Sequence, residues 1–259
     1  MAAQIDGGNN WVFSRLRFPS HSPCEGNFFG ANVRMRHYGG MISVVIPTAN
    51  SERLLPRCFD SLITAAVRGV VREVIVSDSG STDQTLTIAD AAGAHIVHAG
   101  KGRSERLTEG AAIAKSDWLL FLHPETALEP GWEVEAESFI DQAVMERPRA
   151  AVFRFALEDF GGEARRAEAK AALRTVFLAL PLGDQGLLIS KRLYQKIGGY
   201  RALTQMEDAD IVRRVGRSRL VRLRARAVNV RRAPKSRLRG FTLTLLHALR
   251  VPSRVVAKL

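Results

Sequence analysis

An acidic, glycine-containing turn follows a short run of branched apolar residues in the first third of the chain. The run is Val74-Ile75-Val76, and the turn after it reads Asp78-Ser79-Gly80-Ser81-Thr82-Asp83. Ligands of open α/β sheets bind beyond the carboxyl ends of the strands. Serine, threonine and aspartate in such a turn can also cap the following helix. The pattern predicts a strand that ends at a nucleotide pocket, with Asp78 as the first candidate residue.

Polar residues follow other predicted strands as well. His123-Pro124-Glu125 comes directly after the apolar stretch 118–122, and Gly100-Lys101-Gly102-Arg103 follows a short strand at 95–98. Further along, Glu207-Asp208 opens a helix. Strand ends therefore gather polar side chains, as expected of a ligand site at the carboxyl edge of a sheet.

The elements that must position these residues alternate between strands and helices. Apolar runs predict strands, and apolar residues at three- and four-residue spacing predict helices. Strands are expected over 42–46, 73–78, 95–98, 118–122, 151–157, 187–189 and 221–226. Helices are expected near 54–63, 83–92, 105–115, 132–145, 163–180, 206–215 and 237–249, with a further one ending at 198–200. The predicted fold class is α/β, with a mostly parallel sheet and helices on both faces.

Positive charge is concentrated at the carboxyl end. The chain has 38 lysine and arginine against 26 aspartate and glutamate residues, but 15 of the basic ones and no acidic one lie in 211–259. Within that stretch, Arg222, Arg224 and Arg226 alternate with apolar residues, which predicts an edge or surface strand with one arginine face. Residues 237–249 predict a basic amphipathic helix, which can dock on protein or lie on a membrane surface.

A chain of 259 residues suits one α/β domain with appendages. We assign the domain to residues 41–233, with a poorly ordered extension at 1–40 and a basic amphipathic segment at 234–259. Because Met41 stands directly before the first strand, translation from Met41 is a further hypothesis. The intact mass of the endogenous protein would decide it.

Cysteine usage and hydropathy favour the cytoplasm. Cys24 and Cys58 fall in different settings and suggest neither a disulfide framework nor a metal cluster. The N-terminus lacks the basic start and apolar core of a signal peptide, and no apolar run reaches the roughly 20 residues of a membrane-spanning helix. We expect a cytoplasmic protein, either soluble or peripheral at the inner face of the cell membrane.

The order of the motifs resembles the family 2 glycosyltransferases, which have the nucleotide-sugar-binding GT-A fold. The matching pieces are ISVVIPTAN (42–50), EVIVSDSGSTDQT (73–85), residues 100–126, GDQGLLISKRLYQKIGGY (183–200) and QMEDADIVRRV (205–215). The chain looks closest to the bacterial subgroup named transferase 2, radical-SAM/selenodomain-associated. The resemblance covers about 41–259. It implies a Rossmann-like, mixed and mainly parallel sheet, and transfer of a sugar from a nucleoside diphosphate sugar to an acceptor hydroxyl with inversion.

By this resemblance, the nucleoside lies at the ends of the first two strands. Pro47, Thr48 and Asp78 would border the base and ribose, because a carboxylate can accept hydrogen bonds from an imide or a ribose hydroxyl. The alternative role of Asp78 is a turn or helix cap, which suits Asp83 better. We therefore assign binding to Asp78 and capping to Asp83.

Lys101 and Arg103 could pair with the diphosphate, since their charge is complementary and the glycine between them lets the backbone approach. A solvated basic loop is the alternative. The subgroup usually has a second arginine two residues after Arg103, where this chain has Glu105. Arg106 is a possible substitute.

The metal site of the family is commonly an Asp-x-Asp motif, which aligns here with His123-Pro124-Glu125. Glu125 would present its carboxylate to Mg²⁺ or Mn²⁺, which usually take one or two protein carboxylates plus phosphate oxygens. The glutamate is longer than the usual aspartate, so the ion or the backbone would have to shift. For His123, a hydrogen-bonded position at the strand end is favoured over ligation.

The Glu207-Asp208 pair resembles the acidic motif in which the second carboxylate is the usual base. The resemblance implies that Asp208 takes the proton of the acceptor hydroxyl, with Glu207 binding or orienting the acceptor. Two acids at a helix start also suit ordinary capping. Asp184 and Gln185 would face the acceptor, and their alternative role is a turn before the next strand.

Three alternatives remain open. One is a GT-A relative without catalytic activity, because of the altered motif at 123–125. Another is a basic protein that binds membrane or nucleic acid, although arginines interleave poorly with aromatics and no recognised nucleic-acid motif is present. A nicotinamide-linked Rossmann enzyme is disfavoured, because PTANSERL after the first strand lacks the glycine fingerprint. Of the partners, a lipid-linked acceptor and an anionic membrane surface are favoured over nucleic acid. Sugar, base and acceptor are not specified.

Overall fold

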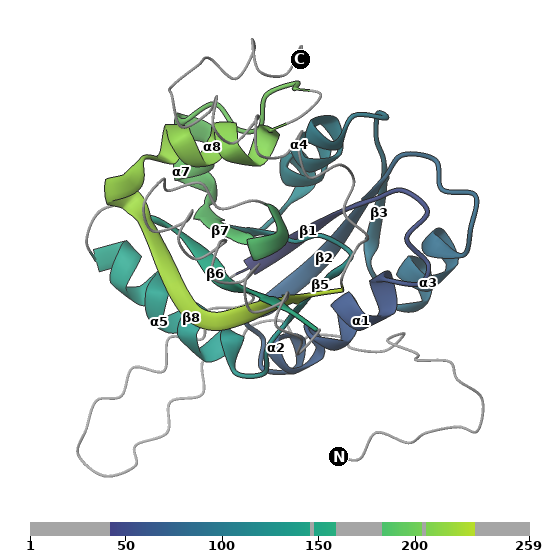
Figure 1. Ribbon diagram of the computed structural model, residues 1–259, viewed down its shortest axis with the longest axis horizontal. Coiled ribbons are helices and arrows are strands. Elements are labelled where there is room, and N and C mark those ends of the chain that lie inside the picture. The colour runs from purple at the N-terminus through teal and green to yellow at the C-terminus, as the bar shows by residue number, and fades with distance from the viewer. Residues whose placement is uncertain (1–41, 146–147, 159–182, 204–205, 231–259) are drawn as a thin grey trace, which may run out of the picture.

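The computed structural model describes residues 42–145, 148–158, 183–203 and 206–230. The predictions for the extension 1–40, the helix at 163–180 and the helix at 237–249 lie outside the described residues. The described part is built on one eight-stranded sheet with the strand order β3-β2-β1-β4-β7-β6-β8-β5 (Figure 1).

The first half of the sheet is parallel. β1 (Ile42–Thr48) pairs with β2 (Val71–Asp78) on one side and with β4 (Trp118–Phe121) on the other, and β2 pairs with β3 (His95–His98). All seven residues of β1 are buried, which suits a central strand covered on both faces. The carboxyl ends of these strands therefore open at one edge, where the polar turns follow.

The second half mixes directions. β7 (Leu187–Ser190) runs antiparallel to β4 and to β6 (Ala150–Leu157), and β6 pairs in parallel with β8 (Leu220–Asn229). β5 (Thr126–Leu128), a short strand that the sequence did not indicate, pairs antiparallel with the end of β8. The predicted mixed, mainly parallel α/β sheet is confirmed.

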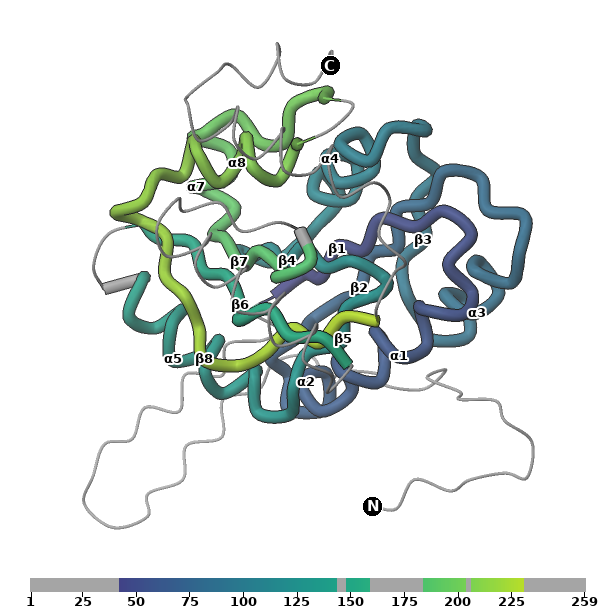
Figure 2. The backbone as a smooth tube through the Cα atoms, viewed as in Figure 1, coloured from purple at the N-terminus to yellow at the C-terminus, as the bar shows by residue number. Residues whose placement is uncertain are grey.

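Helices cover both faces of the sheet (Figures 1 and 2). The bounds are α1 Leu55–Asp60, α2 Ile63–Val67, α3 Thr85–Ala91, α4 Arg103–Ile113, α5 Trp132–Met145, α7 Lys191–Lys196 and α8 Glu207–Val215. α1, α2, α3 and α5 supply buried residues to one core, and α4, α7 and α8 to the other. Within β1 the division alternates, since Val44 and Ile46 enter the first core and Val45 the second.

One prediction of secondary structure was wrong in detail, and one on β8 is confirmed. The single helix expected near 54–63 is divided into α1 and α2 at Ser61, whose carbonyl accepts a hydrogen bond from the Trp132 indole (3.0 Å). The edge or surface strand predicted over 221–226 is confirmed, because β5 pairs only with Ala227, Val228 and Asn229 and leaves that stretch of β8 with β6 as its one strand partner. Its three arginines are exposed, and the backbone N–H groups of Arg224 and Ala225 donate to the Glu135 carboxylate (2.7 and 2.8 Å).

In the part of the chain that the structure describes, no helix is long and apolar enough to cross a membrane.

Candidate active site

Asp78 is fully buried at the end of β2 and organises the turn after it. Its Oδ1 accepts hydrogen bonds from the hydroxyls of Thr48 (2.8 Å) and Ser81 (2.5 Å), and its Oδ2 accepts from the backbone N–H of Gly80 (2.8 Å) and Ser81 (2.7 Å). Burial acts to raise the pKa of Asp78, but these hydrogen bonds outweigh it and lower the pKa. The carboxylate is therefore ionised at neutral pH and ties the ends of β1 and β2 together.

The turns after β1 and β2 also bind each other directly. Asn50 N–H donates to the Ser81 hydroxyl (2.8 Å), and Thr82 N–H donates to the Asn50 side-chain oxygen (2.9 Å). Asn50 has a φ of 49°, in the left-handed region that asparagine tolerates better than most residues. This pairing, which the sequence did not predict, joins the turn after β1 and the turn after β2 into one rim at the carboxyl edge of the sheet.

Pro47 and Thr48 lie within this rim and are both buried at the end of β1. Asp83 has the predicted capping role, since its Oδ1 accepts from the N–H of Thr85 (3.0 Å), the first residue of α3. Its other oxygen accepts from Glu52 N–H (3.1 Å). Asp83 thus caps α3, and Asp78 also has the turn role that was its alternative, because its two oxygens accept four hydrogen bonds from Thr48, Gly80 and Ser81.

The loop before α4 depends on two glycines and one acid. Glu105, which stands where the resemblance suggests a second arginine, accepts a hydrogen bond from Gly102 N–H (3.2 Å) and so caps α4. A Cβ at Gly100 would lie 2.0 Å from the Glu105 carboxylate. Lys101 is exposed between the two glycines, and Arg106 turns toward Ser79, to whose hydroxyl it donates (2.6 Å).

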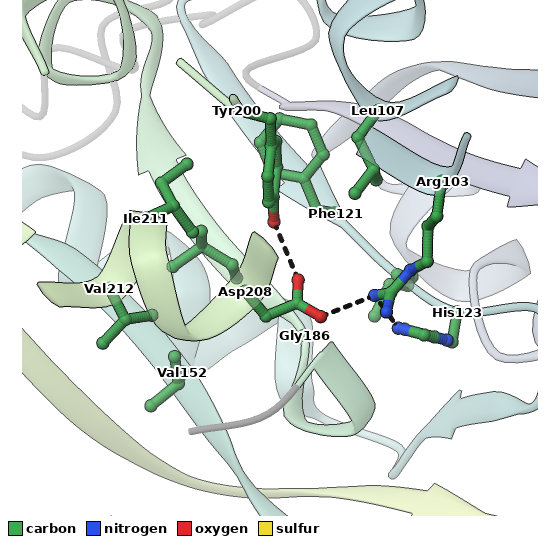
Figure 3. Close-up of a pocket in the computed structure, with 12 residues that line it drawn as sticks. Arg103, Leu107, Phe121, His123, Val152, Gly186, Tyr200, Asp208, Ile211 and Val212 are labelled. Atoms are coloured by element: carbon green, nitrogen blue, oxygen red, sulfur yellow. Dashed lines mark hydrogen bonds and ion pairs between the residues drawn. The ribbon is translucent and has the colours of Figure 1, made fainter. Parts of the chain in front are cut away.

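Arg103, the first residue of α4, meets the acidic pair at the start of α8 (Figure 3). Its guanidinium lies 3.0 Å from Glu207 Oε1 and 2.8 Å from Asp208 Oδ2. Burial acts to lower the pKa of Arg103, but the charges of Asp208, Glu207 and Asp184 raise it. The residue expected to bind diphosphate is therefore also the counter-ion of the predicted base.

His123 lies on the other side of the same guanidinium, with its Nε2 in contact with Arg103 Nη2. Arginine can only donate, so Nε2 is the acceptor and the neutral ring carries its proton on Nδ1. Nδ1 in turn faces Glu125 Oε1 at 3.8 Å. The imidazole is hydrogen-bonded at the strand end, as the sequence favoured.

Tyr200 completes the surroundings of Asp208 and was not indicated by the sequence. Its hydroxyl donates to Asp208 Oδ1 (3.2 Å), and its ring packs edge-on against Phe121 with 5.0 Å between centroids. Both carboxylate oxygens of Asp208 thus have partners, one cationic and one neutral. Figure 3 shows Tyr200 and Arg103 in contact with Asp208, and His123 in contact with Arg103, within one pocket that Gly186 also lines.

Glu207 lies beside this pocket with 5% of its surface exposed. Burial raises its pKa, and the negative charge of Asp208 adds to the rise, while Arg103 opposes it. The preceding Met206 has a φ of 63°, an uncommon conformation for a residue with a Cβ. α8 therefore begins abruptly, with both acids directed at Arg103.

The two residues expected to face the acceptor have different surroundings. Asp184 lies in the short 3₁₀ turn Gly183–Gln185, near enough to raise the pKa of Arg103 by its charge, and its carbonyl accepts from the Asn229 amide (2.7 Å). Gln185 is 2% exposed and donates to the Phe153 carbonyl (3.4 Å). The charge of Asp184 thus acts on Arg103, and Gln185 fixes the turn through its hydrogen bond to Phe153.

Few of the described side chains are placed to bind a divalent cation. Within the described ranges, no group of three or more histidine, cysteine, aspartate and glutamate residues could hold a metal ion. Glu125, with 11% of its side chain exposed, supplies one carboxylate beside His123. One carboxylate fits a Mg²⁺ or Mn²⁺ ion that takes its remaining ligands from phosphate oxygens and water.

Part of the chain is similar in sequence to known glycosyltransferases. Residues 43–154 match the model of the family described as Glycosyl transferase family 2. A PGL/p-HBAD biosynthesis glycosyltransferase of Mycobacterium tuberculosis is 34% identical over 95 residues, which are 34% of this chain and 36% of the relative. Glucosyl-3-phosphoglycerate synthase of the same organism is 38% identical over 93 residues, which are 32% of this chain and 28% of that protein.

The likeness in three dimensions is broader. The crystal structure of M. tuberculosis glucosyl-3-phosphoglycerate synthase with Mn²⁺, UDP and glucosyl-3-phosphoglycerate has a TM-score of 0.57 at 24% identity, over 83% of this chain and 81% of that one. The structure of the same synthase with Mg²⁺ and UDP gives a TM-score of 0.59 with the same coverage. The fold of this chain is therefore of the GT-A type.

Proposed function

We propose that this protein is a family 2 glycosyltransferase that moves a sugar from a nucleoside diphosphate sugar to an acceptor hydroxyl, with inversion at the anomeric carbon. The observation that carries the proposal is the Asp208 carboxylate, held by Arg103 and Tyr200 in a pocket at the carboxyl edge of the sheet. The match of 43–154 to the family model supports it, as does the subgroup resemblance of the sequence.

In this proposal the nucleoside lies on the rim formed by Pro47, Thr48 and Asp78. The rim is pre-organised, because Asp78 already holds both strand ends and the turn after β2. Lys101 and Arg103 would carry positive charge to the diphosphate. UDP is the first nucleotide to test, because it is bound by the synthase of similar fold.

A divalent cation, Mg²⁺ or Mn²⁺, would be held by Glu125 and the diphosphate. When bound, such an ion supplies positive charge that stabilises the leaving phosphate oxygens. The same synthase was crystallised with Mn²⁺ or Mg²⁺ together with UDP. His123 would keep Glu125 and Arg103 in place rather than ligate the ion.

For the chemical step, the acceptor oxygen attacks the anomeric carbon on the face opposite the diphosphate. Asp208 takes the hydroxyl proton as the new bond to carbon forms, and the bond to the phosphate oxygen breaks with its electron pair leaving on the diphosphate. Arg103 offsets the charge that develops on the leaving group. Glu207 and Asp184 would orient the acceptor, with Gln185 fixing the turn that carries Asp184.

We also propose that the protein works at an anionic membrane surface, on a lipid-linked acceptor. Support comes from the basic stretch 211–259, of which β8 exposes Arg222 and Arg224. Lysine and arginine near an anionic surface contribute about 1 kcal/mol each. Liposome flotation of the full chain and of a version ending near Ala233 should differ, and equal flotation would refute the tail as the anchor.

The donor is identified by thermal shift with a panel of nucleotide sugars, with and without Mn²⁺. A ligand that binds only the folded state raises the melting temperature by mass action. The nucleotide sugar that stabilises the protein is then used in the transfer assay.

Transfer itself is tested with Asp208→Asn, which keeps the shape of the side chain but removes the base. We expect loss of transfer with nucleotide binding retained, while the control Asp90→Asn, at an exposed position on α3, keeps full activity. Full activity of Asp208→Asn would refute its assignment as base. Nucleotide binding by the wild type without transfer to any acceptor would favour the non-catalytic relative.

A further inference from the structure

Four arginines form one exposed face of the paired strands β6 and β8. We call this surface the arginine face; its members are Arg154 on β6 and Arg222, Arg224 and Arg226 on β8. Along β8 they alternate with Leu223, which is buried in the first core, and Ala225, which packs against it. Because successive side chains of a strand point to opposite faces, the arginines point away from that core. The arginine face is therefore presented on the side of the sheet that α4, α7 and α8 cover.

The arginine face continues the wall of the pocket that holds Asp208. Val152 lines this pocket (Figure 3), and Arg154 follows it by two residues on β6, so both side chains leave the strand on the same face. On β8, Arg222 is the register partner of Val152, and Arg226 is that of Arg154. In the strand order, β6 and β8 lie on one side of β4, whereas β1 and β2, which carry the nucleoside rim, lie on the other. The arginine face thus borders the proposed base from the side opposite the rim.

The positive charge of the arginine face is neutralised only in part. Glu129 accepts two hydrogen bonds from Arg226 (2.8 and 3.1 Å), which lower the pKa of Glu129, and the charge of Arg154 adds to the fall. In the described ranges, no carboxylate lies within ion-pair distance of Arg154, Arg222 or Arg224. Like charges on directly opposed residues of neighbouring strands destabilise a sheet, as Arg154 and Arg226 are. A bound anion would offset this excess of positive charge.

We propose that the arginine face binds a phosphate group of the acceptor, whose reacting hydroxyl then lies at Asp208; this inference rests on the proposed function. The nucleotide donor carries its own phosphates on the other side of β4, so an anion on the arginine face belongs to the second substrate. A planar guanidinium can donate two parallel hydrogen bonds to phosphate oxygens. A small phosphate ester and a lipid headgroup present the same oxygens. The acceptor class is therefore a hydroxyl compound that also carries a phosphate.

The test compares acceptors that carry a phosphate with acceptors that lack one. Glycerol, inositol and glucose are each assayed beside their monophosphates. Phosphatidylinositol and diacylglycerol, each in phosphatidylcholine vesicles, form the lipid pair. Transfer is measured with the nucleotide sugar that the thermal-shift panel identifies. We expect transfer to a phosphate-bearing acceptor and not to its neutral counterpart, and the free and lipid pairs show which source of phosphate is used.

The arginines are tested by the triple variant Arg154→Gln/Arg222→Gln/Arg224→Gln. We expect KM for the phosphate-bearing acceptor to rise about tenfold, because several exposed charge pairs are lost together, with kcat and UDP affinity little changed. The difference from the wild type should shrink at high salt, because exposed charges are screened. The matched control is Arg72→Gln/Arg192→Gln, in which the arginines at the starts of β2 and α7 are exposed at the opposite edge of the sheet.

The outcomes separate this inference from the proposed function. If no nucleotide sugar binds the wild type, the proposed function falls, and this inference with it. If the donor binds but neutral acceptors are used as well as their phosphates, or no phosphate-bearing acceptor is used, the inference alone is wrong. An unchanged KM in the triple variant would also overturn it, and reduced liposome flotation at unchanged KM would give the arginine face to the membrane instead.

Folding of the variants is checked by thermal melting. Arg154→Gln should not lower the melting temperature, because it removes a like charge opposite Arg226. If the triple variant is not folded, the KM values of the single variants Arg154→Gln and Arg222→Gln decide, and both should be raised.

Discussion

The guanidinium of Arg103 donates to the carboxylate of Asp208 across 2.8 Å and so connects the first residue of α4 with the first turn of α8. The same guanidinium lies 3.0 Å from Glu207. Two buried carboxylates on one helix turn repel each other when both are ionised, and the guanidinium between them offsets that repulsion. Arg103 therefore has a structural role independent of any ligand.

The first prediction concerns stability in Arg103→Gln. Glu207 and Asp208 lose their counter-ion, and we expect the free energy of unfolding to fall by about 1–3 kcal/mol at pH 7. Because burial already raises the pKa of Glu207 in the folded state, its ionised form is disfavoured there. The protein therefore loses stability as pH rises from 4.5, the ordinary pKa of a glutamate, through the raised pKa of Glu207 in the folded state. Removal of Arg103 raises that folded-state pKa further, so the loss continues to higher pH.

Urea unfolding at pH 5 and pH 7 checks this. The deficit of Arg103→Gln relative to the wild type should be smaller at pH 5, where Glu207 can be protonated. Arg72→Gln should show no deficit at either pH. An equal deficit at both pH values would mean that the loss is of packing rather than of charge.

The second prediction concerns Asp78→Asn. An amide cannot accept from all four donors around Asp78, so the turn would lose about 1–3 kcal/mol of stability at pH 7. The pKa of Asp78 is lowered in the folded state, so its contribution is complete above the ordinary value of 3.8 and is lost as pH falls through the folded pKa.

Denaturant titrations from pH 7 down to pH 3 distinguish the charge from the shape of this side chain. The wild type should lose stability below about pH 4 more steeply than Asp78→Asn, which has already lost that contribution. Asp90→Asn serves as the exposed control. Parallel pH curves for wild type and Asp78→Asn would contradict the role given to the carboxylate.

The third prediction separates Tyr200 as a positioning residue from Tyr200 as a core residue. Tyr200→Phe keeps the ring against Phe121 but removes the hydroxyl that donates to Asp208. In the proposed transfer reaction we expect kcat to fall about tenfold, the size of one hydrogen bond to a charged group, with KM for the nucleotide sugar little changed. Steady-state kinetics measures both constants, and a change confined to KM would place Tyr200 in donor binding instead.

The sequence was sufficient for the strands up to β4, because each contains a run of apolar residues and a polar turn follows it. The polar residues after these strands were therefore found as well, among them Asp78 and Glu125. Tyr200 and Asn50 were missed, since their roles depend on contacts with Asp208 and Ser81 from distant segments. Neither residue stands out by type or spacing, so only the folded chain reveals them.

Arg103 shows that a residue can be found from the sequence while its partners cannot. Its position after Gly102 and the family resemblance indicated phosphate binding, but nothing in the local pattern indicated an ion pair with Glu207 and Asp208. Conversely, Glu105 looked like a lost phosphate ligand, and the structure explains it as the cap of α4. Spacing identifies which residues can do chemistry, whereas tertiary packing decides with which partners.

The last prediction concerns the contact between α4 and β1, because α4 carries Arg103 and Arg106. Gly110 packs against β1 so closely that a Cβ there would lie 2.5 Å from Cγ1 of Val45. Alanine would gain about 0.5–1 kcal/mol of helix propensity, but overpacking costs about 1–3 kcal/mol, so Gly110→Ala should be net destabilising. The double variant Gly110→Ala/Val45→Ala makes room for the new methyl group and should be more stable than the sum of the single effects. A double-mutant cycle by urea unfolding should therefore give a coupling of about 1 kcal/mol. Strict additivity would mean that α4 can shift away from β1, and Arg103 would then be held by its acidic partners alone.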